Sequence, residues 1–178
     1  SMRVNMGNIE NKGIELTINA TPVQLRDFSW QTTLTYTKNK NKVLKLSEGK
    51  SFVEDGKYLI EEGSPLGQWF GQKALGIYAT DEANAYIKNS DGSFGDRLIP
   101  VYQRDPNNYN NYIYGSNGKP IFSHYETKGG QKYAGDVGQM TTAGSVSKGG
   151  DIIWDDLDHD GVIGDSDRRI LGNGMPTW

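Results

Sequence analysis

Twelve residues near the C-terminal end have the spacing of a loop that binds a divalent cation. Residues 156–167 read DLDHDGVIGDSD, with carboxylates at loop positions 1, 3, 5 and 12 and glycine at position 6. Ca²⁺ takes several oxygen ligands about 2.3–2.6 Å away, which alternate residues of a tightly turning loop supply. The pattern therefore predicts a structural Ca²⁺ site. Its expected ligands are Asp156, Asp158, Asp160, the backbone carbonyl of Val162, and Asp167.

The same aspartates have a second interpretation, an ion-free turn whose side chains accept hydrogen bonds from backbone N–H groups. Seven acidic residues and no Lys or Arg lie from Asp151 to Asp167, and a bound cation would relieve their repulsion. Position 12 is Asp rather than the longer Glu, and Gly164 at position 9 leaves that vertex to water. His159 is expected to point to solvent and Ile163 to anchor the loop in a core. Both interpretations stay open.

A tyrosine-rich stretch is the second group that could bind a ligand. Tyrosine rings offer flat contact surfaces of low conformational entropy, and the Asn and Gln residues between them suit recognition of hydroxyl groups. The alternative is that the rings pack against one another within a loop. The candidates for contact with a substrate or partner are Tyr102, Tyr109, Tyr112 and Tyr114.

Residues suited to catalysis are few. The two histidines, His124 and His159, do not stand beside a nucleophile motif. Cysteine is absent, which excludes disulfides and thiolate metal sites. Because the acids concentrate in the cation-type loop, we expect no enzyme.

Composition favours a loop-rich β protein. The 178 residues include 23 Gly and 10 Tyr, and the mean hydropathy is −0.67. A net charge of −3 argues against a nucleic-acid partner. No apolar run is long enough for a transmembrane helix. Ser1-Met2 is typical of an expression remnant, so we expect the chain to be a fragment of a longer protein.

Two segments near the N-terminal end alternate between apolar and polar residues. In residues 13–20 and 28–37, every second side chain is apolar or aromatic over much of the run. This period predicts two antiparallel strands joined by residues 21–27, the second continuing to Leu46. The strands suit a soluble β-sandwich. A second interpretation is a pair of membrane-barrel strands with the apolar side facing lipid and the polar side facing the lumen, although the alternation alone favours the sandwich.

The long middle of the chain, residues 47–150, is rich in Gly, Asn, Ser and Tyr. Short strands are expected at 69–78, 98–103 and 120–125. A short capped helix is expected over 80–88, and one helical turn over 166–171. A stretch of this length is more often functional or disordered than a neutral connector.

Three groups of segments, taken together, resemble the SusC/RagA family of TonB-linked outer-membrane transporters. Their order and approximate spacing match the late barrel region of that family, and they cover most of the chain outside about 90–148. The groups are Gly7–Leu16 with Phe28–Trp30 and Asn39–Val43; Glu62–Gly67 with Phe70–Gly71 and Ala74–Tyr78; and Gly150–Ile152 with Asp156–Asn173.

The resemblance implies a mainly β fold. It implies one or more antiparallel hairpins from an outer-membrane β-barrel, plus a long loop-rich region with a short helix. The expected divisions of this part of the barrel domain are the strand hairpin over 1–46, a long extracellular loop over 47–150, and the calcium-type loop with the start of the next strand over 151–178.

The resemblance also implies a function, nutrient import across the outer membrane of a Gram-negative bacterium. The expected partners are TonB, a SusD-like surface lipoprotein, outer-membrane lipid, and a glycan or peptide nutrient. The isolated fragment is expected to self-associate through its free strand edges. The alternative function is that of a secreted, calcium-stabilised β-sandwich module for adhesion or carbohydrate binding.

Overall fold

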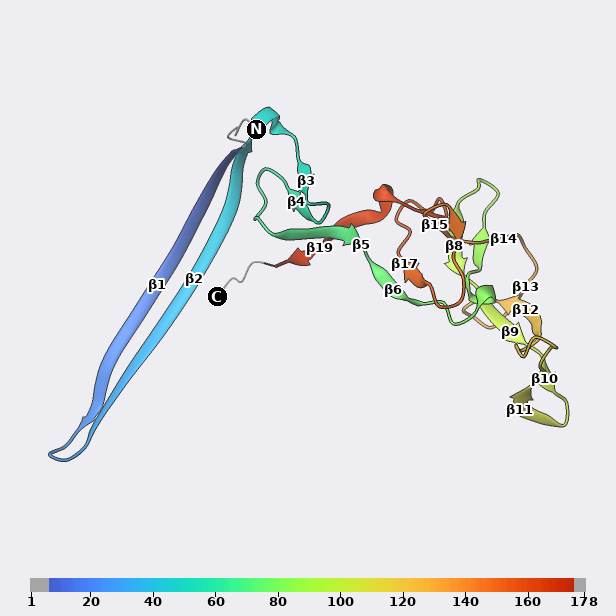
Figure 1. Cartoon of the computed structure of the whole chain (residues 1–178), viewed down its shortest axis with the longest axis horizontal. Coiled ribbons are helices and arrows are strands. Elements are labelled where there is room, and N and C mark those ends of the chain that lie inside the picture. Colours follow the sequence, from blue (N-terminus) through green and yellow to red (C-terminus); the bar gives the residue numbers. More distant parts are fainter. Residues whose placement is uncertain (1–6, 175–178) are drawn as a thin grey trace. The chain divides into compact units, whose positions relative to one another are not determined.

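The computed structural model describes residues 7–174, which form mainly short antiparallel strands (Figure 1). Within this range the helical elements are three 3₁₀ turns of three residues each. None of the helices in the described part has the length and apolar character needed to cross a membrane. The prediction of a mainly β protein with antiparallel hairpins is confirmed.

The described residues form two compact units, which we treat separately. The first contains the residues up to Gly71 and from Ile170 onward, and the second contains Gln72–Arg169. The strands of the first unit, two of which cross its boundary, are β1 (Gly7–Gln24), β2 (Ser29–Leu46), β3 (Phe52–Glu54), β4 (Tyr58–Ile60), β5 (Gln68–Gln72) and β19 (Arg168–Asn173), with the turn η1 (Ser47–Gly49).

The second unit is built from many short strands. The core at its centre contains Tyr78, Tyr86, Met140 and Ile153. Its elements are β6 (Ala74–Ile77), η2 (Asp81–Ala83), β7 (Tyr86–Lys88), β8 (Phe94–Arg97), β9 (Ile99–Tyr102), β10 (Arg104–Asp105), β11 (Asn108–Tyr112), β12 (Phe122–Glu126), β13 (Lys132–Tyr133), β14 (Val137–Gly138), β15 (Thr141–Thr142), β16 (Ser145–Val146), β17 (Ile152–Trp154), β18 (Val162–Ile163) and η3 (Asp165–Asp167).

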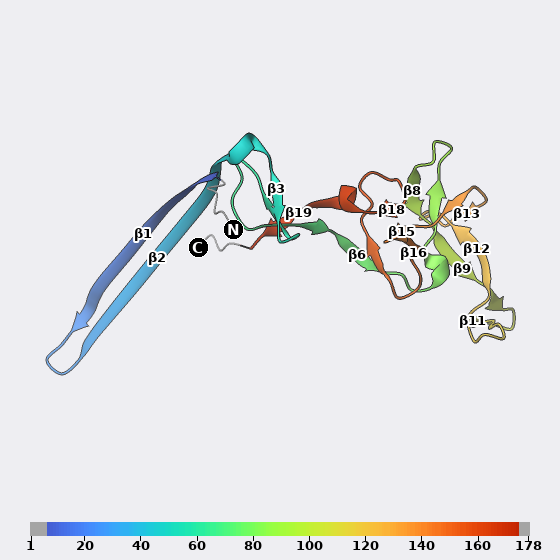
Figure 2. The same ribbon diagram turned by 45° about the horizontal axis from the view of Figure 1, so that its top comes forward.

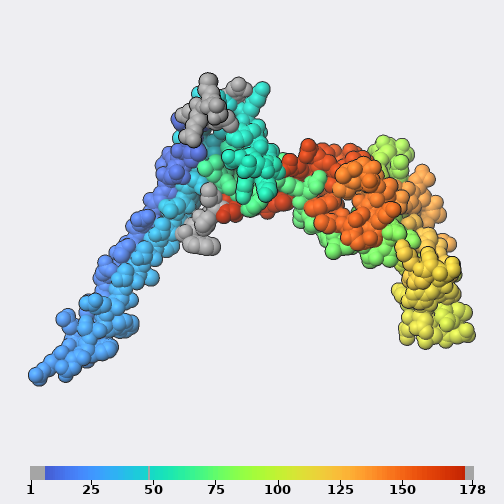
Figure 3. Space-filling view, in the orientation of Figure 1, coloured from blue at the N-terminus to red at the C-terminus, as the bar shows by residue number. Residues whose placement is uncertain are grey.

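Strands β1 and β2 form a long two-stranded hairpin, as the alternating pattern predicted (Figures 1 and 2). The register pairs Leu16 with Tyr36 and Ile18 with Leu34, so these side chains share one face. Thr17 pairs with Thr35 on the opposite face. In the space-filling view the side chains of the hairpin, coloured blue, lie at the surface along both strands (Figure 3). The hairpin therefore has one apolar and one polar face.

The base of the hairpin is covered by the turn that follows β4. The Val43 N–H donates to the carbonyl of Ser64 (2.9 Å), and the Gly63 N–H donates to the carbonyl of Val43 (2.8 Å). The Leu46 N–H donates to Glu62 Oε1 (2.7 Å). Val43 and Leu46 are buried, so β2 changes from an exposed strand to a core element at this end. The segment of residues 62–65 therefore holds the end of the hairpin at which β2 becomes buried.

The predicted helix over 80–88 is wrong. The chain makes only the 3₁₀ turn η2 and then becomes extended, with β7 paired to β8 and β14. Ala85 is fully buried, and its carbonyl accepts a hydrogen bond from the Leu98 N–H (2.8 Å). Pairing on both sides, with the adjacent strand β8 and with the distant strand β14, outweighs the local capping signal.

Two further predicted boundaries differ from the structure. The strand expected over 69–78 is broken at Lys73 into β5 and β6. The helical turn expected over 166–171 lies at η3, and the chain is already in strand β19 from Arg168. In both places the sequence pattern identified a structured segment but not its exact limits.

Candidate functional site

Three carboxylates of the acidic loop converge on one point. One oxygen each from Asp156, Asp158 and Asp167 lies within 4.8 Å of the others. Two oxygens on opposite sides of one Ca²⁺ lie roughly 5 Å apart, because each is about 2.3–2.6 Å from the ion. The three side chains are therefore close enough to ligate a single cation.

Asp156 is the most informative member of this group. Its side chain is 7% exposed, and its Oδ2 accepts a hydrogen bond from the Gly161 N–H (3.0 Å). Its Oδ1 is buried and has no hydrogen-bond partner among the described residues. Burial raises the pKa of this carboxyl, and the charge of Asp167 adds to the effect. An ionised Asp156 is thus costly unless a cation compensates it.

Asp167 closes the loop. It is fully buried, and its two oxygens accept hydrogen bonds from the N–H groups of Leu157 and Gly164, both at 2.8 Å. These bonds join the beginning of the loop to its end. Each carboxylate oxygen has a second lone pair, so the bonds leave capacity for a cation.

The other two predicted carboxylates, those of Asp158 and Asp160, are exposed, and only the first belongs to the converging group. Asp158 belongs to the three-carboxylate group, and a hydrogen bond from the Ser166 side chain lowers its pKa. Asp160 lies outside that group, and its Oδ1 accepts a hydrogen bond from the Val162 N–H (2.6 Å). The structure thus brings together three of the four predicted carboxylates. His159 is exposed, with its backbone in the left-handed region (φ 61°).

The backbone of the loop connects distant parts of the second unit. The carbonyl of His159 accepts from the Phe94 N–H (2.8 Å), and the carbonyl of Gly161 accepts from the Thr141 N–H (2.9 Å). Gln72 Nε2 donates to the carbonyl of Gly164 (2.8 Å). The backbone of the loop is therefore hydrogen-bonded to three other segments of the unit.

Gly161 is required at its place in the loop for two reasons. Its φ of +78° lies in the left-handed region, and a Cβ there would lie 2.4 Å from the Phe94 ring. The aromatic ring on β8 thus packs directly on the turn that presents the carboxylates. A glycine at position 6 was part of the sequence pattern, but its contact with Phe94 was not visible in it.

Asn84 is a buried residue whose hydrogen bonds join distant segments of the second unit, and the sequence did not indicate this role. Its side chain is fully buried and donates to the carbonyls of Met140 (2.9 Å) and Ser147 (2.7 Å). Its Oδ1 accepts from the Met140 N–H (2.8 Å). These partners are 56 and 63 residues away in sequence, so no local pattern could have indicated them.

Comparison with known proteins identifies the family. No family model matches the chain. TonB-dependent receptor P39 of Formosa agariphila is 37% identical over 179 residues, which cover all of this chain and 15% of that protein. The chain belongs to the TonB-dependent receptor family. The other receptors that match include TonB-dependent receptor P3 of the same organism and TonB-dependent receptor SusC of Bacteroides thetaiotaomicron.

The two further matches agree with the resemblance to SusC/RagA proteins, which is confirmed. P3 is 24% identical over 183 residues, covering 98% of this chain and 13% of P3. SusC is 29% identical over 129 residues, covering 72% of this chain and 10% of SusC. The chain therefore spans only a small part of the length of these receptors.

The four candidate tyrosines of this receptor segment lie in two environments. Tyr102 is half-buried, its ring meets Tyr112 edge-on (6.1 Å between centroids), and its hydroxyl bonds Thr80 Oγ1 (2.5 Å). The guanidinium of Arg104 lies 3.8 Å from the centroid of Tyr112. Tyr109 and Tyr114 are 78% and 59% exposed. The first pair packs within the loop. The second pair is exposed, although the Arg104 guanidinium lies 5.7 Å from the centroid of Tyr109.

Proposed function

We propose that this chain is part of an outer-membrane transporter that imports a glycan or peptide nutrient into a Gram-negative bacterium. In this proposal TonB supplies the energy coupling, and a SusD-like surface lipoprotein works with the barrel. The observation that carries it is the identity of 37% with a TonB-dependent receptor across the whole chain. We propose no catalytic role.

The hairpin has the strand length and the exposed apolar face expected of strands that cross a membrane. Its strands have 18 residues each, more than the roughly 9–11 that a strand needs to cross a bilayer. Ile14, Leu16 and Leu34 are 69%, 51% and 63% exposed, so the described residues of the first unit leave the apolar face without the cover that lipid would provide. The two-stranded sheet also leaves an edge on each strand, which neighbouring barrel strands would pair.

The same features favour the transporter over the secreted β-sandwich module. A sandwich buries the apolar face of each sheet against a second sheet. Here the described residues of the first unit place no sheet on the apolar face of β1 and β2, whose large side chains are about half exposed or more. The exposed apolar face therefore supports strands that face lipid over strands of a water-soluble module.

The acidic loop has a structural role in the proposal, as a Ca²⁺ site. Asp156, Asp158 and Asp167 would hold the ion, and the unpartnered buried oxygen of Asp156 supports its presence. The ion would neutralise the cluster and fix the loop that connects Gln72, Phe94 and Thr141. The Val162 carbonyl remains a predicted ligand.

The exposed tyrosines suit the outer surface of such a transporter. Outer-membrane barrels place long loops outside the cell and short turns on the periplasmic side. The second unit would then be extracellular, with Tyr109 and Tyr114 available to the lipoprotein or the nutrient.

Cysteine labelling of intact cells tests this topology. With Asn110→Cys in the full-length protein, an impermeant thiol reagent should label the protein, because β11 would lie outside the cell. With Gln24→Cys at the hairpin turn, labelling should appear only after the cells are opened. Both positions are exposed, and the chain has no cysteine of its own. The reverse labelling pattern would contradict the topology.

A further inference from the structure

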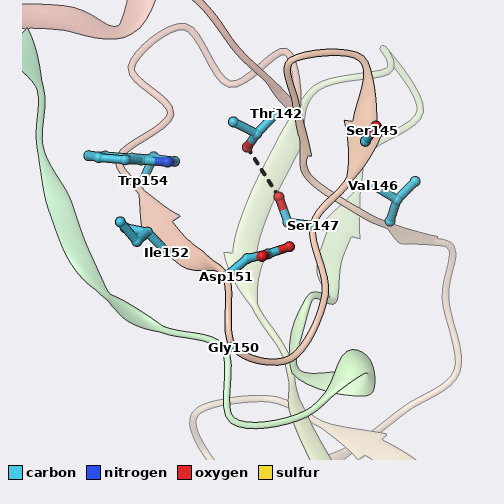
Figure 4. Close-up of a pocket in the computed structure, with 8 residues that line it drawn as sticks. All are labelled: Thr142, Ser145, Val146, Ser147, Gly150, Asp151, Ile152 and Trp154. Atoms are coloured by element: carbon cyan, nitrogen blue, oxygen red, sulfur yellow. Dashed lines mark hydrogen bonds between the residues drawn. The ribbon is translucent and has the colours of Figure 1, made fainter.

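The second unit contains a pocket that none of the features above explains. It has a volume of about 370 Å³ and lies between residues 142–147 and residues 150–154 (Figure 4). Ligand pockets in proteins measure roughly 300–1,000 Å³, so this one suits a single small ring rather than a long chain. In Figure 4, Trp154 and Ile152 lie on one side, and Thr142, Ser147 and Asp151 lie on the other.

The apolar side of the pocket is held in place by backbone pairing. Strand β17 pairs antiparallel with β6, which places Trp154 opposite Ala74. Ile153, between the two pocket residues, points into the core and is buried. Ile152 is 41% exposed and Trp154 is partly exposed, so an indole and an aliphatic side chain line this side.

The polar side offers hydroxyl groups and one carboxylate. Thr142 Oγ1 and Ser147 Oγ are hydrogen-bonded to each other (3.1 Å). Asp151 is exposed, and its Oδ2 accepts from the Lys148 N–H (2.7 Å). That bond fixes the orientation of the carboxylate, while no hydrogen bond within residues 7–174 uses Oδ1. A ligand hydroxyl can therefore donate to an oriented carboxylate.

A second pocket of the same unit differs from the first because its polar groups are already paired with one another. It lies near Asp81, Tyr102 and Lys119 and has a volume of about 280 Å³. There the Asp81 carboxylate accepts from the Gly149 N–H (2.9 Å) and pairs with Lys119 Nζ (3.2 Å), and the Tyr102 hydroxyl bonds Glu82 (3.2 Å). Its polar groups satisfy one another, so we assign it a structural role.

The lining of the first pocket selects among ligand classes. No basic residue lines it, which disfavours an anion. A single carboxylate among hydroxyls suits a neutral ligand with several O–H donors, and the indole suits the apolar C–H face of a ring. We propose that this pocket binds one neutral sugar ring, stacked on Trp154 and hydrogen-bonded to Asp151. Resting on the proposed function, this assigns the nutrient to carbohydrates rather than peptides.

Saturation-transfer NMR on the full-length protein in detergent tests the site. The probes are D-glucose, D-galactose, D-mannose and, as a mimic of a basic peptide side chain, N-acetyl-lysine amide. At least one sugar should bind. Asp151→Asn should weaken that binding about tenfold, because hydrogen bonds to a charged group are the stronger ones. Trp154→Leu should weaken it as well by removing the stacking surface.

Asp96→Asn is the matched control, since it removes an exposed carboxylate elsewhere in the same unit. It should leave sugar binding unchanged. The proposal is overturned if no sugar binds, if Asp151→Asn binds the sugar as tightly as the unaltered protein, or if the lysine derivative binds in place of the sugars. Uptake by living cells is measured separately. Sugar binding at this pocket without import would contradict transport while leaving the site intact.

Discussion

Replacing Asn84 by alanine is expected to destabilise the second unit by about 2–6 kcal/mol. The substitution removes the hydrogen-bond partner of the Met140 N–H and of the Ser147 carbonyl. Met140 and Ser147 are both buried, so water cannot replace the lost bonds without opening the structure. Each buried polar group left without a partner costs about 1–3 kcal/mol.

Hydrogen exchange across residues 72–169 of the full-length protein measures this effect. Protection should fall for the amides of Leu98 and Met140, which bond Ala85 and Asn84 in the native state. Asn89→Ala is the control, because Asn89 is exposed and its side chain bonds, among residues 7–174, only the nearby Ser93 Oγ (3.0 Å). It should change stability by no more than about 0.5 kcal/mol. Equal protection in the two variants would show that Asn84 does not hold the unit together.

The features that the sequence predicted correctly depend on local patterns. The hairpin could be predicted because alternation over many residues gives each strand two distinct faces. The convergence of Asp156 and Asp158 follows from their spacing in a tight turn, and Asp167 returns to them through the same loop. In both cases the partners are close in sequence, so spacing alone carries the information.

The features that the sequence did not predict depend on distant partners. The segment around Tyr86 has a capping signal for a helix, but it is extended because β14 and β8 pair with it from both sides. Strand β14 and the core residues Met140 and Ile153 are far from this segment in sequence, and the strands concerned have only two to four residues. Strands this short have too few positions for an alternating pattern to be read.

The candidate binding residues show the same difference between features that depend on local patterns and features that depend on distant partners. Tyrosine enrichment indicated a contact surface, yet Tyr102 and Tyr112 are occupied by packing within the loop. Nothing in the amino-acid composition indicated the pocket beside Trp154. It arises because the pairing of β17 with β6 brings an indole opposite the hydroxyls of another turn. A site assembled in this way becomes visible only in three dimensions.

Adding millimolar Ca²⁺ is expected to raise the stability of the second unit relative to the same protein in a chelator. An ion that binds only the folded state stabilises it by about 2.7 kcal/mol when its concentration is 100 times the dissociation constant. The physical reason lies in Asp156, whose buried Oδ1 has no other partner among the described residues. With the ion present, three converging carboxylates no longer repel one another.

Asp158→Asn separates ion binding from folding. Asp158 is exposed, so the loss of its charge should leave the chelated protein folded while it abolishes most of the stabilisation by Ca²⁺. Asp160→Asn is the matched control, since Asp160 is also exposed but lies outside the three-carboxylate group. Melting curves of the full-length protein in Ca²⁺ and in chelator measure both variants. Identical curves for the unaltered protein in the two conditions would exclude the ion. If Asp160→Asn lost as much stabilisation as Asp158→Asn, the ligand set would follow the sequence spacing rather than the observed cluster.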